Sequence, residues 1–295
     1  MWSDFPTLSR SGWIALPALV LAPNAVAAQA EVPDHRHEVR PIAAVDEVWI
    51  EDMTWMEVRD AIDGGATIAI IPTGGIEQNG PYLTTGKHNV IMTGACETIA
   101  RKLGNALCAP VVGFVPEGDI DPPSSHMLFP GTISLTQETY RALLEDIGAS
   151  LLVHGFTDVI FIGDSGGNQA GMRDVAGILT ERWAGRGGRA HYVEEFYRPG
   201  YNEADRFVAE ELGLVETHRD GYHDDPTVTL LMMAVDPLTV RHPQRVEAGL
   251  ASINGVDLTP LEERIEDGRR LNEFRADLTV DAIRRAVAAP FPQDR

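Results

Sequence analysis

Residues 66–80 read ATIAIIPTGGIEQNG, a continuous apolar run that breaks into glycines, amides and one carboxylate. A short apolar run bounded by glycine and proline is typical of a strand that is buried on both faces. Glycines after such a strand allow a tight turn and close approach of the backbone. The stretch therefore predicts a buried strand over 66–72 and a polar loop, 73–89, that the strand directs into a site.

Similar apolar runs recur along the chain and alternate with amphipathic stretches. We expect further strands over 106–115, 158–163 and 189–196. Helices are expected from a capping box at Thr54 to Gly64, and over 90–104, 136–154, 168–185, 202–212, 227–235 and 260–288. This alternation predicts an α/β fold with a mostly parallel sheet and helices on both faces. Sites in such folds gather in loops at the carboxyl ends of the strands.

The composition of the 295-residue chain is that of a globular protein, with 44% hydrophobic and 23% charged residues. Its formal net charge is −20. Nucleic acids and anionic membranes bind basic surfaces, so this charge argues against both as partners. We therefore expect neither nucleic acid nor a membrane as a partner, which leaves a small-molecule substrate open.

The N-terminal stretch GWIALPALVLAPNAVAAQA, residues 12–30, resembles a secretory signal that ends in small residues. It is too short and too interrupted by proline for a membrane span. We expect residues 1–30 to be a signal peptide, 31–48 an N-terminal arm and 49–295 a single domain. The protein would then be periplasmic or secreted. The alternative is an uncleaved extension, which would leave the chain cytoplasmic.

Cys96 and Cys108 are the only cysteines, and they lack the spacing of a zinc site. We expect two buried thiols. A disulfide between them is left open, because an oxidising compartment would allow one.

The loop 73–89 carries Glu77, Asn79, Lys87 and His88. A glutamate oxygen and a histidine nitrogen in one folded-back loop could share a Zn, Mn or Fe ion. The alternative is a surface loop with a solvated glutamate.

Three other loops carry polar groups. Loop 116–131 holds His126, expected to point inward, and three acids expected on a rigid surface loop: Glu117, Asp119 and Asp121. In IGDSGGN, residues 162–168, Gly166 and Gly167 at a helix start could hold an anion through backbone N–H groups. Before the helix at 227, the dipole of the helix explains Asp224 and Asp225, and His223 is the more informative residue.

Several short motifs in order resemble the creatininase (creatinine amidohydrolase) family, over roughly residues 50–240. They are Gly74, Glu77-Gln78, Gly80-Pro81 and Leu83 in the first loop, the turn Phe129-Pro130-Gly131-Thr132 preceded by His126, and Gly166-Gly167-Asn168. The resemblance implies a three-layer α/β/α sandwich, often a hexamer, with two divalent ions. It also implies that a bridging water attacks the carbonyl of a cyclic amide or a related C–N substrate.

The departures from the family pattern fall on its metal ligands. The first ligand, a glutamate, is kept as Glu77. The family's histidine two residues on is Asn79, its aspartate is His88 and the histidine of its glycine loop is Ser165. The glutamate that creatininase itself has two residues later falls on Gly167.

We therefore expect a remodelled centre with one divalent ion (Zn, Mn or Fe), a second being left open. Its ligands would be Glu77, His88 and Asp164. His223 and His126 are candidates for proton transfer or for a further ligand. Candidate substrate contacts are Asn79, Ser165, Gly166, Gly167, Asn168 and Asp224.

The expected activity is metal-dependent hydrolysis of a C–N bond in a cyclic amide by a metal-activated water. Asn79 and His88 argue against creatinine itself. The alternatives are a lactone or ester hydrolase, an isomerase on the same scaffold, and a non-catalytic protein that binds a small ligand. A homo-oligomer, by resemblance a hexamer, is expected.

Overall fold

The computed structural model describes residues 34–290, so the expected signal peptide lies outside the described part of the chain. Of the described residues, 40–290 belong to one compact unit, and the description below concerns that unit. Within residues 34–290, no helix combines the length and apolarity that crossing a membrane requires.

A parallel four-stranded sheet in the order β2-β1-β3-β4 forms the centre of this unit. Its strands are β1 (Ile68–Thr73), β2 (Ala106–Cys108), β3 (Asp158–Gly163) and β4 (Arg189–Tyr192). Every residue of β1 and β3 is buried, which confirms the strands expected from their apolar runs. The strand expected over 106–115 is shorter than predicted. It ends at Cys108 because Pro110, two residues on, has no N–H to donate to the ladder.

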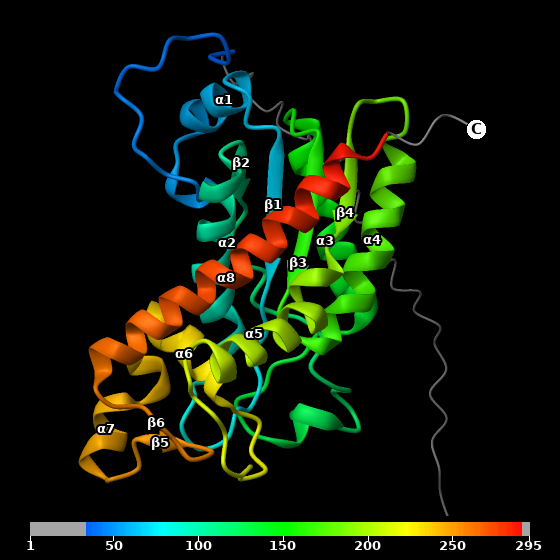
Figure 1. Ribbon diagram of the computed structural model, residues 1–295. Helices are drawn as coiled ribbons and strands as arrows, with labels where there is room; N and C mark the ends of the chain where they lie inside the picture. The colour runs from blue at the N-terminus through cyan, green and yellow to red at the C-terminus, as the bar shows by residue number, and fades with distance from the viewer. Residues whose placement is uncertain (1–33, 291–295) are drawn as a thin grey trace, which may run out of the picture. The chain divides into compact units, whose positions relative to one another are not determined.

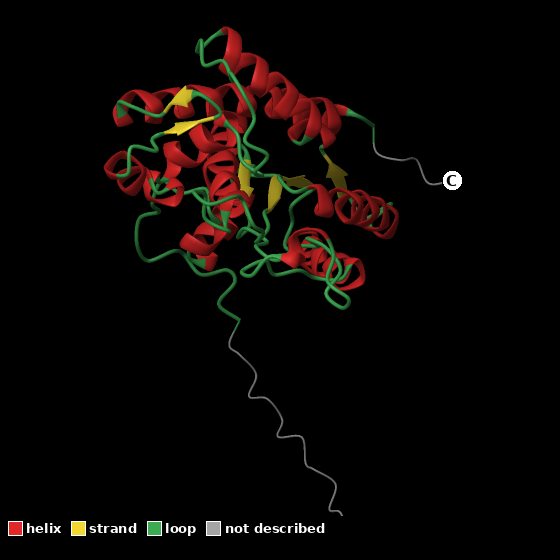
Figure 2. Cartoon of the chain, turned by 90° about the horizontal axis from the view of Figure 1, so that it is seen from below, coloured by secondary structure: helices red, strands yellow, loops and turns green. Residues whose placement is uncertain are grey.

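Helices cover both faces of the sheet, as expected for a three-layer α/β/α sandwich (Figures 1 and 2). Because side chains alternate along a strand, Ile68 and Ile70 of β1 pack on one face and Ala69 and Ile71 on the other. On the first face lie α2 (Lys87–Leu103) and α8 (Leu261–Ala288). On the second lie α1 (Trp55–Asp63), α3 (Gln137–Val153) and α4 (Gln169–Arg182).

Local signals place the helix ends. Thr54 and Glu57 form the expected capping box at the start of α1, and Thr136 caps α3 through the backbone N–H of Thr139. Helix α2 begins at Lys87, three residues before the expected start, after Gly86. Lys87 and His88 therefore belong to the first turn of a helix and not to a loop, which holds their side chains in place.

A third apolar cluster lies toward the carboxyl end of the sheet, beside α2 and α8 (Figure 1). It includes the expected helices α5 (Arg198–Glu210) and α6 (Pro226–Val235). The sequence reasoning did not anticipate α7 (His242–Glu247) or the hairpin of β5 (Ser252–Ile253) and β6 (Val256–Asp257). Short 3-10 turns complete the fold: η1 (Ile50–Asp52), η2 (Ser125–Leu128), η3 (Gly166–Asn168), η4 (Glu194–Phe196) and η5 (Pro237–Val240).

A disulfide joins Cys96 of α2 to Cys108 of β2, with a Cα–Cα distance of 6.2 Å. The expectation of two free thiols was wrong. Helix α2 packs directly on β2, so the two side chains meet in the same apolar cluster. The bond ties the helix that carries His88 to the edge of the sheet.

Candidate active site

The carboxyl ends of the parallel strands bring the polar loops of the chain together. Glu77 follows β1, Asp164 follows β3 directly, and Glu117 lies on the segment that continues beyond β2. His223 arrives from the loop before α6, and η2 carries His126. The cluster therefore forms at the edge of the sheet where sites are expected in parallel α/β folds.

His88 lies between two buried carboxylates. Its Nε2 is 2.7 Å from Glu77 Oε1, and its Nδ1 is 2.8 Å from Asp164 Oδ2. Burial and the charge of Lys87 would lower the pKa of His88, but the hydrogen bonds to Asp164 and Glu77 outweigh them and raise it. The structure thus brings together the three residues predicted as metal ligands.

The two carboxylates that contact His88 bind different ring nitrogens, so they have different roles. The ring nitrogens point in divergent directions, so an ion bound at Nε2 with Glu77 does not reach Asp164 at Nδ1. A carboxylate on the far nitrogen of a ligating histidine typically fixes its tautomer and ring orientation. The assignment of Asp164 as a ligand stays a prediction, and the geometry favours an orienting role.

Asp164 is itself held on several sides. The hydroxyl of Tyr201 donates to its carboxylate oxygens at 2.8 and 3.0 Å, and Arg275 lies 3.4 Å from Oδ1. Burial would raise the pKa of Asp164, but its contacts with His88 and the charge of Arg275 lower it. Asp164 is therefore an anion whose partners fix its position.

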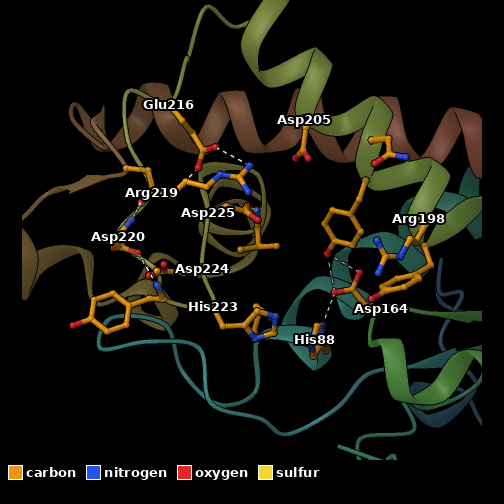
Figure 3. A pocket seen from close by; sticks show the side chains of 18 residues that line it. His88, Asp164, Arg198, Asp205, Glu216, Arg219, Asp220, His223, Asp224 and Asp225 are labelled. Carbon is orange, nitrogen blue, oxygen red and sulfur yellow. Dashed lines mark hydrogen bonds and ion pairs between the residues drawn. The ribbon is translucent and has the colours of Figure 1, made fainter. Parts of the chain in front are cut away.

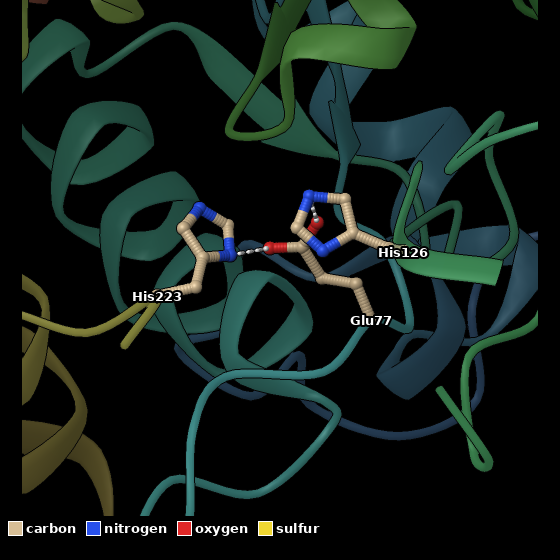
Figure 4. A group of neighbouring side chains, drawn as sticks. All are labelled: Glu77, His126 and His223. Atoms are coloured by element: carbon tan, nitrogen blue, oxygen red, sulfur yellow. Dashed lines mark ion pairs between the residues drawn. The ribbon is translucent and has the colours of Figure 1, made fainter. Parts of the chain in front are cut away.

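Glu77 is the centre of the cluster (Figure 4). Its Oε1 lies 3.1 Å from His223 Nδ1 and 3.2 Å from Lys87 Nζ, and its Oε2 lies 3.3 Å from His126 Nε2. The side chain is 2% exposed. Burial would raise the pKa of Glu77, but hydrogen bonds with His223 and His88 and the charge of Lys87 lower it.

Glu117, expected on a surface loop, is instead buried, with 4% exposure. Ser165 Oγ donates to its Oε2 at 2.9 Å, and its own backbone N–H donates to Ser134. Within the described part of the chain, its Oε1 has no hydrogen-bond partner. Burial, followed by the charge of Glu77, raises the pKa of Glu117 to about 8. Asp119 and Asp121 are exposed, as expected.

The position of Glu117 had a signal that the sequence reasoning did not use. The residue directly follows the apolar run ALCAPVVGFVP, just as the loops of Glu77 and Asp164 follow β1 and β3. A carboxylate at the carboxyl end of a third core segment is therefore a candidate for the same site.

Two overlapping groups of side chains could hold a metal ion. One is Glu77, His126 and His223, and the other is Glu77, His88 and Glu117; in each, the ligand atoms lie within 4.8 Å of one another. Carboxylate oxygens and imidazole nitrogens are ligands that Zn and Mn accept. The unpartnered Oε1 of Glu117 is a buried acceptor that a cation would satisfy. The residues present therefore fit a divalent ion.

Of the predicted substrate contacts, two asparagines are occupied with holding the backbone. Asn79 Nδ2 donates to the carbonyls of Glu77 and Thr84, and Asn168 Nδ2 donates to Thr73 and Gly74. Both are buried. Contact of either with a substrate stays a prediction, and the structure shows them bracing the loops of the site.

Two adjoining cavities have His88 in their lining. One of about 290 Å³ is lined by Glu77, Glu117, His126, Ser165, Gly166 and Gly167. The other, of about 530 Å³, is drawn in Figure 3 and is lined by groups that include Lys87, Arg198, Tyr201, Asp205 and Asp224. His88, Tyr197 and His223 line both. Spaces of this size accept a small molecule.

A parallel α/β sheet with buried carboxylates and imidazoles at its carboxyl edge defines an α/β enzyme with a candidate metal site. The family model for creatininase, described as creatinine amidohydrolase, matches residues 51–275. The chain therefore belongs to the creatininase family, and its expected class, a hydrolase, agrees with that family.

Curated relatives and solved structures support this placement. Creatinine amidohydrolase of Pseudomonas putida is 24% identical over 83% of this chain and 98% of its own length. Mycofactocin precursor peptide peptidase of Mycobacterium ulcerans (strain Agy99) is 26% identical over 75% of this chain and 86% of its own. A crystal structure of creatininase superposes with a TM-score of 0.57 at 21% identity, covering 85% of this chain and 100% of that one, which shows the fold. Solved creatininases include a Zn-Zn form and a Mn form.

Proposed function

We propose that this protein is a metal-dependent hydrolase that opens a C–N bond of a small cyclic amide other than creatinine. The observation that carries the proposal is the position of Glu77, a buried anion surrounded by His88, His126 and His223 in the lining of the smaller cavity. Glu77 and His88 would hold the ion. When bound, a divalent ion polarises a carbonyl and lowers the pKa of water.

The residues around that position have separable tasks. Asp164 keeps the ring of His88 oriented through Nδ1. His223, with 47% of its side chain exposed, and His126 lie on the open side of Glu77, where a substrate enters. An imidazole in that place can transfer protons between water and a leaving nitrogen. Gly166 and Gly167 line the smaller cavity, and the N–H group of Gly166 could stabilise an oxyanion there.

The replacement of family ligands by Asn79 and His88 supports the exclusion of creatinine. Asn79 uses its amide N–H groups on the backbone of its own loop. At position 88 the family pattern has an aspartate. This chain has a histidine there, which contacts the carboxylates of Glu77 and Asp164. A changed metal environment favours a changed substrate.

One observation favours a metal-free site instead. The ammonium of Lys87 is buried 3.2 Å from Glu77 Oε1 and already offsets its charge. With no ion, the same pocket would serve a protein that binds a small ligand. A lactone or ester hydrolase, or an isomerase, would keep the ion and differ only in its products.

Metal analysis beside a substrate screen tests the proposal. Wild type, Glu77→Gln and the exposed control Glu138→Gln are purified without a chelator or a histidine tag, then assayed on lactams, cyclic imides and lactones. We expect about one or more divalent ions per wild-type chain and ring-opened acids from cyclic amides. Loss of a group that only orients a metal ligand typically lowers metal affinity or activity about 10–100-fold. Glu77 would itself be a ligand, so Glu77→Gln should lower activity about 100-fold or more.

Each possible result of this test favours a different function. A wild type without metal moves the function to the metal-free alternative. Turnover of lactones alone favours the ester-type reaction. Full metal content in Glu77→Gln contradicts the assignment of the ion to this cluster.

We also propose that the protein is exported and forms a homo-oligomer. The Cys96–Cys108 disulfide supports an oxidising compartment, and the oligomer rests on the family resemblance. N-terminal sequencing of the mature chain after cell fractionation tests export. Sedimentation of the purified protein tests the oligomer.

A further inference from the structure

By the resemblance to creatininase, Gly167 falls where that enzyme has a ligand glutamate, and the structure shows that a side chain at this position would collide with the backbone. A Cβ atom built on Gly167 would lie 1.7 Å from the carbonyl oxygen of Pro116. The obstacle is backbone, which cannot swing aside as the end of a side chain can. The segment before Glu117 therefore fills the space that a ligand at 167 would need.

The same segment delivers a carboxylate of its own. Glu117, the next residue after Pro116, turns its side chain into the smaller cavity beside Glu77 and His88. Its Oε1 would lie 2.0 Å from a Cβ atom on Gly75, so glycine at 75 makes room for it. Glycine at 167 thus leaves room for the segment that carries Glu117, and glycine at 75 leaves room for its side chain.

We propose that Glu117 is a metal ligand, so that Glu77, His88 Nε2 and Glu117 bind one divalent cation. The inference rests on the proposed metal dependence and adds to it a ligand that lies outside the family pattern.

Charge and hydrogen bonding support a cation at this place. Glu77 and Glu117 are two buried carboxyl groups whose ligand oxygens lie within 4.8 Å of one another and of His88, a spacing at which one divalent ion can contact both. Ser165 satisfies only Oε2 of Glu117. Among residues 34–290, the ion pair that Lys87 makes here is with Glu77, and no basic side chain pairs with Glu117. A cation held by both carboxyl groups would satisfy Oε1.

Binding of Zn²⁺ and of Mn²⁺ to protein stripped with EDTA tests the inference by calorimetry. The variants are Glu117→Gln, which keeps the shape but replaces the carboxyl group by an amide, and Asp121→Asn, an exposed acid of the same loop, as a control. Wild type and Asp121→Asn should bind equally. Glu117→Gln should weaken binding about 100-fold or more, since it removes a ligand and not only a group that orients one.

Thermal unfolding supplies a second readout that a purely structural role would not produce. Without metal, Glu117→Gln should melt at a higher temperature than wild type, because it removes a buried carboxyl group that faces Glu77. With Zn²⁺ in excess the order should reverse, since wild type gains more from the bound ion. A structural role alone would lower the melting temperature of the variant in both conditions.

The outcomes separate this inference from the function on which it rests. Metal binding by wild type and by Glu117→Gln with equal affinity overturns the role of Glu117 and leaves a metal enzyme. Loss of binding in Glu77→Gln but not in Glu117→Gln does the same. Absence of metal binding in wild type overturns both.

Discussion

At the scale of single residues, the site depends on which positions have room for a side chain and on which buried polar atoms have hydrogen-bond partners. Gly167 has no room for a Cβ atom, whereas Glu117 has a buried oxygen that the described residues leave without a partner. His88 is held at both nitrogens, so its neighbours differ in role although both are carboxylates. Predictions at this scale concern one side chain each.

Substitution of Gly167 by alanine tests the steric part of this account. The new methyl group would strike the Pro116 carbonyl and force the backbone to move, at a cost of about 1–3 kcal/mol. Gly177 of α4 is a matched control, because a Cβ atom there meets nothing within 4 Å. Gly177→Ala should stabilise the protein by about 0.5–1 kcal/mol, since glycine is costly inside a helix. Denaturant unfolding of both variants measures the difference, and equal effects would contradict the clash.

The replacement Asp164→Asn distinguishes an orienting group from a ligand. If Asp164 acts only through His88, the variant keeps the wild-type number of ions per chain and loses about 10–100-fold in affinity. Loss of an ion at saturating metal would instead support Asp164 as a ligand. Titration with Zn²⁺ followed by metal analysis gives both quantities.

At the scale of elements, α2 is the helix that couples the core to the site. Its first turn presents Lys87 and His88, its buried side packs on β1 and β2, and Cys96 bonds it to Cys108. Helix α2 begins directly after Gly86, and its first turn therefore places Lys87 and His88 beside Glu77. Movement of α2 relative to the sheet would therefore disturb the site.

Removal of the disulfide should lower stability without abolishing the fold. For a sequence separation of 12 residues, loop closure predicts a loss of about 3 kcal/mol in the free energy of unfolding. Denaturant unfolding of wild type and of the double variant Cys96→Ala/Cys108→Ala measures it. A reductant should destabilise wild type and leave the variant unchanged, and an effect on both would point to another cause.

At the scale of the whole compact unit, a buried ion pair connects the sheet to the end of its longest helix. Arg189 of β4 lies 2.7 Å from Asp158 of β3 and also donates to the carbonyls of Val287 and Ala289 at the end of α8. His191 lies 2.8 Å from the same carboxylate. The contact between the middle of the chain and the end of α8 thus depends on the charge of Asp158.

Acid should release this connection. Burial would raise the pKa of Asp158, but hydrogen bonds from His191, Arg189 and Thr157 outweigh it and hold the pKa below its ordinary value of 3.8. A lowered folded-state pKa stabilises the fold above pH 4, and that stability is lost as the pH falls below 4 through the folded-state pKa. The free energy of unfolding of metal-free wild type, measured from pH 5 to pH 3, should therefore fall more steeply than that of Asp158→Asn. Parallel curves would contradict the role of Asp158.

Much of the architecture was determined by the sequence alone. The buried strands over 66–72 and 158–163, the capped helices at Thr54 and Thr136 and the alternation of strand and helix are set by local apolar periodicity and by capping groups. The same reasoning placed Glu77 and Asp164 at strand ends, and the quoted motifs identified the family. Such signals lie within a few residues of one another, so they can be followed along the chain.

What only the tertiary structure decided is which distant groups meet. Glu117 differs from Asp119 and Asp121 in burial, yet all three are acids of one loop in the sequence. The disulfide and the opposed partners of His88 likewise depend on how α2 packs against the sheet. Burial and pairing are properties of packing between segments, and composition and periodicity describe each segment alone. The sequence could not predict these features because the chemistry of this site arises from contacts between elements that are distant in the chain.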